Sequence, residues 1–128
     1  MTKRILFTPN APKPIGPYSQ AVEAAGFVFV SGQIPIDPQT GNIVEGGIKE
    51  QTKRVLENIK AILEESGLTM EDVVYATVFL KDIRLFNEFN EVYAQYFHRE
   101  PPARVTVQVA DLPRGALVEI SVIAFKKS

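Results

Sequence analysis

Cysteine and tryptophan are absent from this sequence, and there is a single histidine, His98. Without cysteine the chain has no disulfide, no thiolate nucleophile and no sulfur ligand for a metal. One histidine also excludes a site built from several imidazoles. His98 lies where a helix is expected to end, so it complements the helix dipole; a lone general base is the alternative. Any chemistry must therefore use arginine, carboxylate, hydroxyl and backbone groups.

Long apolar runs and a strong charge of one sign are missing as well. No stretch approaches the roughly 20 apolar residues that span a bilayer, and the N-terminal apolar stretch is too short for a signal peptide. The net charge is -1, with 45% hydrophobic and 23% charged residues, as in ordinary globular proteins. We expect one cytoplasmic domain over residues 1–128, with no membrane contact.

The spacing of apolar residues predicts elements in the order β-β-β-α-β-α-β-β. Strands are expected at residues 4–8, 18–24, 27–31, 73–80, 103–110 and 117–125. One helix is expected at residues 48–63, and Asp82 can cap a second one. The second helix carries four aromatic residues on one face, interpreted as core: Phe86, Phe89, Tyr93 and Phe97. We expect an α+β fold of two layers, with both helices on one face of a mixed sheet.

Two of these strands are apolar on both sides. In residues 117–125, Val118 and Ile120 point one way while Ile123 and Phe125 point the other, and residues 27–30 are apolar throughout. One helical layer cannot bury both faces of a sheet. We therefore expect a partner subunit to cover the second face.

Polar side chains interrupt the apolar pattern near the C-terminus. Along residues 103–110, Arg104 and Thr106 alternate with valines. A hairpin closed by residues 111–115 pairs Thr106 with Glu119 and sets Arg104 and Glu119 diagonally on the second face, roughly 7 Å apart. A guanidinium can hold a carboxylate, and a carboxylate can take a proton from water. The residues alone leave two interpretations open, a substrate site and a cross-strand ion pair.

Four segments carry a resemblance to a known family. They are Ala11-Pro12 with Ile15-Gly16-Pro17-Tyr18-Ser19-Gln20; Ser31-Gly32-Gln33-Ile34-Pro35; Val78-Phe79-Leu80-Lys81-Asp82 leading to Asn90-Glu91-Val92-Tyr93; and Pro102-Ala103-Arg104-Val105-Thr106-Val107, through Leu112-Pro113 to Val118-Glu119-Ile120. In this order they resemble the signature of the Rid family, the reactive-intermediate deaminases also called RidA or YjgF proteins.

The resemblance implies a chorismate-mutase-like fold and a homotrimer with active sites between subunits. It also implies hydrolysis of 2-iminobutanoate and 2-iminopropanoate to 2-oxo acids and ammonia, without cofactor or metal. These imines arise when dehydratases act on threonine and serine.

Residue roles carried over from the family are assigned to matching positions. Arg104 would bind the substrate carboxylate, and Glu119 would position and deprotonate the attacking water. Tyr18 would offer its hydroxyl to the water or the imine, across the interface from Arg104.

The remaining positions would complete substrate binding. Ser31 and Gly32 would line the pocket, and Asn90 would join them, with a structural role as its alternative. Thr106 stands where many relatives have cysteine. Because the family's hydrolysis uses no thiol nucleophile, deamination is expected to survive this change.

Two other functional classes use the same chain differently. A non-catalytic module could bind 2-oxo acids through the same arginine. An RNA-cleaving translation inhibitor is the second class, but the net charge of -1 and the lack of a basic stripe argue against RNA binding.

Overall fold

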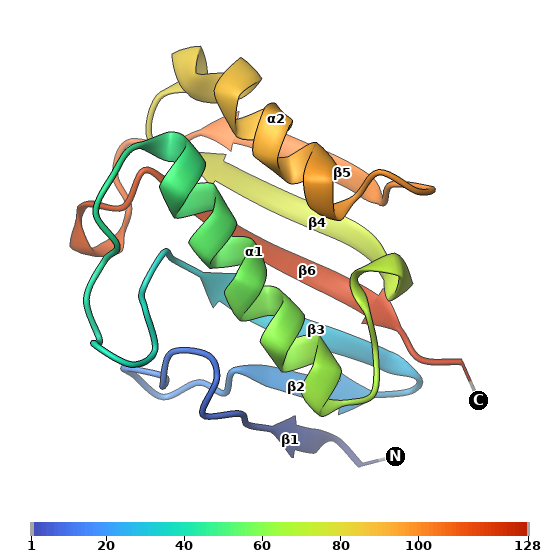
Figure 1. Cartoon of the computed structure of the whole chain (residues 1–128). Helices are drawn as coiled ribbons and strands as arrows, with labels where there is room; N and C mark the ends of the chain where they lie inside the picture. Colours follow the sequence, from blue (N-terminus) through green and yellow to red (C-terminus); the bar gives the residue numbers. More distant parts are fainter. Residues whose placement is uncertain (1, 128) are drawn as a thin grey trace.

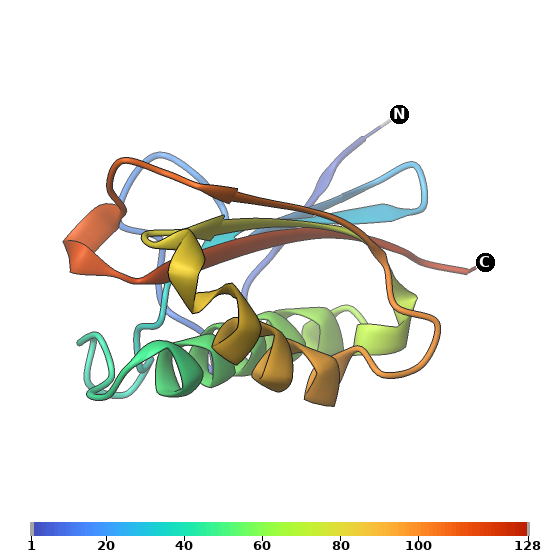
Figure 2. The ribbon, with the colours of Figure 1, turned by 90° about the horizontal axis from the view of Figure 1, so that it is seen from above.

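The computed structural model describes residues 2–127, which form a six-stranded sheet with two helices packed on one face (Figure 2). The strands are β1 (Arg4–Leu6), β2 (Ala21–Ala24), β3 (Phe27–Gln33), β4 (Val73–Leu80), β5 (Ala103–Gln108) and β6 (Val118–Phe125). The helices are α1 (Ile48–Glu65) and α2 (Phe86–Tyr96). The predicted α+β architecture and its element order are confirmed.

The sheet has the strand order β1-β2-β3-β6-β4-β5, as Figure 1 shows. Neighbouring strands are antiparallel except for β4 and β5, which are parallel. The expected hairpin between β5 and β6 is wrong, because β4 lies between them. From β4 the chain crosses over through α2 and returns parallel as β5, at the sheet edge. Strand β6 then enters the centre, where a strand that is apolar on both sides is best buried.

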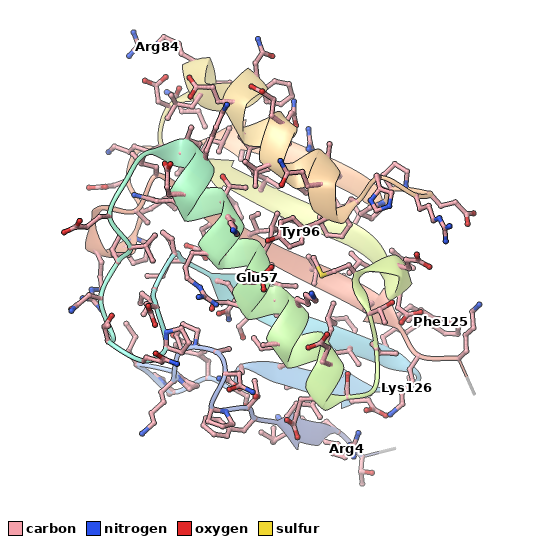
Figure 3. All side chains as sticks on the ribbon, viewed as in Figure 1. Arg4, Glu57, Arg84, Tyr96, Phe125 and Lys126 are labelled. Carbon is pink, nitrogen blue, oxygen red and sulfur yellow. The ribbon has the colours of Figure 1, made fainter. Side chains whose placement is uncertain are left out.

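The two helices lie side by side over the sheet, α1 across β3 and β6 and α2 toward β4 and β5 (Figure 1). The Glu50 carboxylate accepts a hydrogen bond of 2.9 Å from the Gly47 amide where α1 begins. Between the helices, the Tyr96 hydroxyl donates to Glu57 at 2.6 Å. Figure 3 labels both side chains, which lie close together between α1 and α2. Burial and this bond raise the pKa of Tyr96. Within residues 2–127, neither helix is long and apolar enough to cross a membrane.

The hydrophobic core lies between the sheet and the helices. The inward-facing side chains of β6 are at most 1% exposed: Val118, Ile120, Val122 and Ala124. They belong to one cluster with the apolar stripe of α1, which includes Val55, Leu56 and Ile59. This packing orients the sheet, because β6 must turn its other side outward.

The outward face of the sheet carries large apolar side chains that the helices do not cover. Phe27, Phe29 and Phe125 are 37%, 44% and 41% exposed, and the rings of Phe27 and Phe125 are 5.2 Å apart. Val105 and Val107 of β5 are also exposed. The expected uncovered second face is therefore present in the chain, and its cover by a partner subunit stays a prediction.

Candidate active site

Four of the site residues expected from the sequence line one cavity on the outward face. The cavity measures about 360 Å³, and its polar lining comes from Tyr18, Ser31, Gly32 and Glu119. Ile15, Ile34 and Pro113 form its apolar wall. We call this group the acidic half-site, because Glu119 is its only ionisable carboxylate among the described residues.

The proline-rich segment before β2 carries Tyr18 into the acidic half-site. The buried Gln20 side chain holds this segment in place: it accepts from the Thr8 amide at 2.7 Å and donates to the carbonyls of Thr8, Ala11 and Pro12 at 3.0–3.3 Å. Tyr18 is 49% exposed, and its hydroxyl accepts a 3.3 Å hydrogen bond from the Ile15 amide. Within residues 2–127 this hydroxyl donates no hydrogen bond, so its proton is available to a ligand.

Glu119 has the environment of a candidate general base. It lies opposite Phe79 on the outward side of β6. Burial raises the pKa of the Glu119 carboxyl above its ordinary value of 4.5. Within residues 2–127 no cation or hydrogen-bond donor pairs with it. A carboxyl with a raised pKa that faces a cavity is suited to proton transfer near neutral pH.

A break in the β3–β6 pairing brings backbone close to Glu119. The register shifts between Val30 and Gln33, so Ser31 and Gly32 form a bulge. A Cβ atom at Gly32 would overlap Oε2 of Glu119 and lie 3.0 Å from its Cδ. The Ser31 hydroxyl donates to the Ser19 carbonyl at 2.6 Å, so this residue lines the cavity and also anchors the preceding loop.

Arg104 lies elsewhere, on the helix-covered side of β5. Its guanidinium carbon is 4.6 Å from the ring centroid of Tyr93, 5.5 Å from that of Phe89 and 5.6 Å from that of Phe86. No carboxylate within residues 2–127 forms an ion pair with it. We call Arg104 and these three rings the cationic half-site.

Asn90 and Thr106 also belong to this side of the chain. Asn90 lies on α2 one turn after Phe86 and one turn before Tyr93, so it shares their helix face. Thr106 follows Arg104 on the same side of β5, opposite Val78, and its buried hydroxyl has no hydrogen-bond partner in the described chain.

The expectation that Arg104 and Glu119 share one face of the sheet is wrong. The register sets Arg104 opposite Ala76, a buried residue under the helices, and Glu119 opposite Phe79, which points outward. Thr106 does not pair with Glu119 either. The alternation within each strand was assigned correctly, but the assumed hairpin placed the wrong side of β5 outward.

One kind of site residue was missed from the sequence. The aromatic residues of α2 were interpreted as core, yet three of them also surround Arg104. The signal available was aromatic spacing of i, i+3 and i+7 on a helix that leads directly into an arginine-bearing edge strand. His98 is exposed and lies two residues after the end of α2, close to the expected helix end, and it belongs to neither half-site. In the described residues no group of three His, Asp or Glu side chains could hold a metal ion.

Comparison with known proteins identifies the class to which this fold and these half-sites belong. A family model described as Endoribonuclease L-PSP matches residues 8–126. A RutC family protein of Pyrococcus abyssi is 60% identical over 127 residues, covering 99% of this chain and 100% of the relative. A solved structure of a Yersinia pestis protein of the conserved Rid protein family has a TM-score of 0.94 at 49% identity, covering 97% and 99% of the two chains.

The chain therefore belongs to the endoribonuclease L-PSP family, the Rid family that its sequence resembles. The predicted family membership is confirmed. One relative, from Homo sapiens, is named 2-iminobutanoate/2-iminopropanoate deaminase; it is 44% identical over 126 residues, covering 98% of this chain and 92% of the relative.

Proposed function

We propose that the protein hydrolyses small 2-imino acids, such as 2-iminobutanoate and 2-iminopropanoate, to 2-oxo acids and ammonia. The observation that best supports this proposal is the environment of the Arg104 side chain. It is a partly buried cation held by aromatic rings, with no anionic partner in the described chain. A cation kept from water without an anion is suited to bind one from a ligand, and a guanidinium fits a carboxylate bidentately.

The acidic half-site supplies the groups that the hydrolysis needs. Glu119 takes a proton from a water molecule while the oxygen of that water attacks the imine carbon. The Tyr18 hydroxyl hydrogen-bonds to the imine nitrogen. Glu119 gives the proton taken from water to the nitrogen, which yields the neutral tetrahedral carbinolamine. Glu119 then takes the hydroxyl proton of the carbinolamine and passes it to the nitrogen, the C–N bond breaks to release ammonia, and the carbonyl of the 2-oxo acid forms. A raised carboxyl pKa favours this double role, because the group must both accept and donate the proton.

One chain cannot offer both half-sites to one small substrate, because they lie on opposite faces of its sheet. We propose that two copies share each site. Arg104, Asn90 and Thr106 then come from one subunit, and Tyr18, Ser31, Gly32 and Glu119 from the next. Such a contact joins two different surfaces and can repeat around a closed ring. The exposed apolar face of each chain supports this assembly, and a homotrimer is the ring that we propose.

The apolar wall of the acidic half-site supports small substrates with an aliphatic side chain. The side chains of Ile15, Ile34 and Pro113 are apolar and can pack against such a group. Burying an ethyl or methyl group against this wall lowers the free energy of binding by about 25 cal/mol per Å² of apolar surface removed from water. Both proposed imines carry such a group, ethyl in one and methyl in the other.

A coupled assay tests the proposed function. A threonine dehydratase releases its unstable product, and formation of 2-oxobutanoate is followed with and without this protein. We expect faster release of the oxo acid with the parent protein and none of that gain with Arg104→Ala. If the parent protein binds 2-oxobutanoate but gives no acceleration, it is a binding module, and the proposed hydrolysis is wrong.

A further inference from the structure

We propose that Tyr93 is a positioning residue that holds the Arg104 guanidinium in place for a ligand carboxylate. This inference rests on the proposed role of Arg104 in the deaminase. Tyr93 is 6% exposed and lies on α2, while Arg104 lies on β5. Of the three rings around the guanidinium carbon, that of Tyr93 is the nearest, at 4.6 Å.

An aromatic cage suits this task better than a carboxylate partner would. The ring faces attract a cation through their quadrupole and so offset part of its loss of water. They do not neutralise its charge, and they do not occupy its N–H donors as a carboxylate does. An Asp or Glu in place of Tyr93 would compete with the substrate for the same N–H donors of the guanidinium. The cage therefore keeps Arg104 both oriented and available.

The packing around Tyr93 fixes the position of its ring. Its centroid is 5.4 Å from that of Phe89 and 4.5 Å from that of Phe97, so neighbours on both sides restrict it. The Tyr93 hydroxyl is buried without a hydrogen-bond partner in residues 2–127. Burial raises the pKa of Tyr93, and Arg104 opposes that rise through its charge and through its closeness to the hydroxyl, although the two groups do not meet in hydrogen-bond geometry. The hydroxyl thus stays neutral at physiological pH, and the ring contacts the cation as a phenol.

The test compares three variants of α2. Tyr93→Leu removes the ring, and Tyr93→Phe keeps it. Tyr96→Leu makes the same Tyr-to-Leu change one turn later, where the hydroxyl bonds to Glu57 and not to Arg104. We expect Tyr93→Leu to raise KM for 2-iminobutanoate about tenfold with a smaller change in kcat, which is within the range of a desolvated cation–π contact. Tyr93→Phe and Tyr96→Leu should both keep KM within about twofold of the parent.

A double substitution separates positioning from general damage to the helix. If Tyr93 acts through the guanidinium, Tyr93→Leu should not raise KM further in an Arg104→Ala background. An equal rise in both backgrounds, or an equal rise with Tyr96→Leu, overturns the proposal. Phe86→Leu, at the less buried rim of the cage, gives the same test if Tyr93→Leu fails to fold, with an expected rise in KM of about threefold.

Failure of this inference can be told apart from failure of the deaminase assignment. Titration with 2-oxobutanoate measures carboxylate binding without any turnover. If the parent protein does not hydrolyse imines, the proposed function fails. Weaker binding of 2-oxobutanoate by Tyr93→Leu than by Tyr93→Phe would then still support the positioning role. Normal turnover together with an unchanged KM in Tyr93→Leu would refute the positioning role alone.

Discussion

The carboxylate of Glu119 occupies the space next to Gly32 where any other residue would have its side chain. A Cβ atom built at Gly32 would lie 3.0 Å from Cδ of Glu119 and 3.3 Å from its Cγ. The two residues meet because the bulge in β3 turns this piece of backbone toward β6. The position of the carboxylate in the cavity therefore depends on the absence of a side chain at residue 32.

We expect Gly32→Ala to displace Glu119 and to lower kcat for imine hydrolysis at least about tenfold, since small shifts of a catalytic group are costly. The chain should still fold, because the group that must move is the end of a flexible side chain. Gly47→Ala is the matched control, since φ is −99° there and the nearest atom to a new Cβ is 3.9 Å away. Steady-state kinetics on freshly generated 2-iminobutanoate measure both variants. A parent-like kcat in Gly32→Ala would contradict the proposed role of Glu119.

The pH dependence of activity should report the ionisation of Glu119. Only the ionised carboxylate can take a proton from water, and burial raises its pKa above 4.5. We expect kcat/KM to fall as the pH drops through an apparent pKa above 4.5. Glu119→Gln should lower kcat roughly 100-fold and lose this acid limb. A pH profile that is flat down to pH 4.5 in the parent protein would refute this assignment.

The same pKa shift has a consequence for stability. A raised carboxyl pKa means that the folded state holds its proton more tightly than the unfolded state. The free energy of unfolding should therefore decrease as the pH rises from 4.5 through the raised pKa. Glu119→Gln removes this loss, so the variant should be at least as stable as the parent at pH 7. Thermal unfolding of both proteins at one concentration, at pH 4 and pH 7, tests this. A variant that is less stable only at pH 7 would show that the carboxylate has a stabilising partner.

Substitution of Arg104 should affect binding more than chemistry, because the substrate carboxylate keeps its charge through the reaction. Truncating one partner of a buried charged pair costs about 2–5 kcal/mol, so Arg104→Ala should lower kcat/KM about 30-fold or more. Arg104→Lys should recover only part of this, because an ammonium cannot donate bidentately. Arg84→Ala is the control: its guanidinium pairs with Asp82 at 2.7 Å, is 87% exposed, and points away from the helices in Figure 3. Equal kinetics in all three variants would leave Arg104 without a role in binding.

The sequence predicted the elements of the fold better than the way they pair. Alternation and helical spacing are local signals, and they identified the six strands and the two α-helices of residues 2–127, including Val73–Leu80 with its observed bounds. The predicted strand at residues 18–24 begins later, at Ala21, because Gln20 holds the preceding segment as a loop. Pairing depends on which strands meet across the sheet. The short connection at residues 111–115 suggested a hairpin, but the parallel return of β5 beside β4 left the central position to β6.

The candidate site was predictable only in part for the same reason. Glu119 was placed on the correct face by its neighbours on β6, whose apolar side had to turn inward. The sequence of β5 contains no such signal for Arg104. Val105 and Val107 form an apolar side that is expected to face inward, and this would turn Arg104 outward. The structure turns those valines outward, where they are 42% and 40% exposed, and sets Arg104 against the aromatic residues of α2.

Opposite placement of Arg104 and Glu119 in one chain leads to a test of shared sites. Arg104→Ala subunits keep the acidic half-site, and Glu119→Gln subunits keep the cationic one. At a substrate concentration well below the KM of the parent protein, each homogeneous protein should be nearly inactive. If each site combines the Arg104 of one subunit with the Glu119 of the next, an interface between the two kinds of subunit restores one intact site. Unfolding an equal mixture and refolding it together distributes the subunits at random.

In such a mixture about three quarters of closed trimers contain both kinds of subunit, and each of these has one intact site out of three. We therefore expect the refolded mixture to recover about one quarter of the parent activity, because three quarters of the trimers each carry one third of their sites. Mixing the two proteins without unfolding is the control and should recover far less. Light scattering should give about three times the chain mass of 14.2 kDa for the parent and both variants. No recovery after refolding, with trimers intact, would mean that each site is built within one chain, and the shared-site model would be wrong.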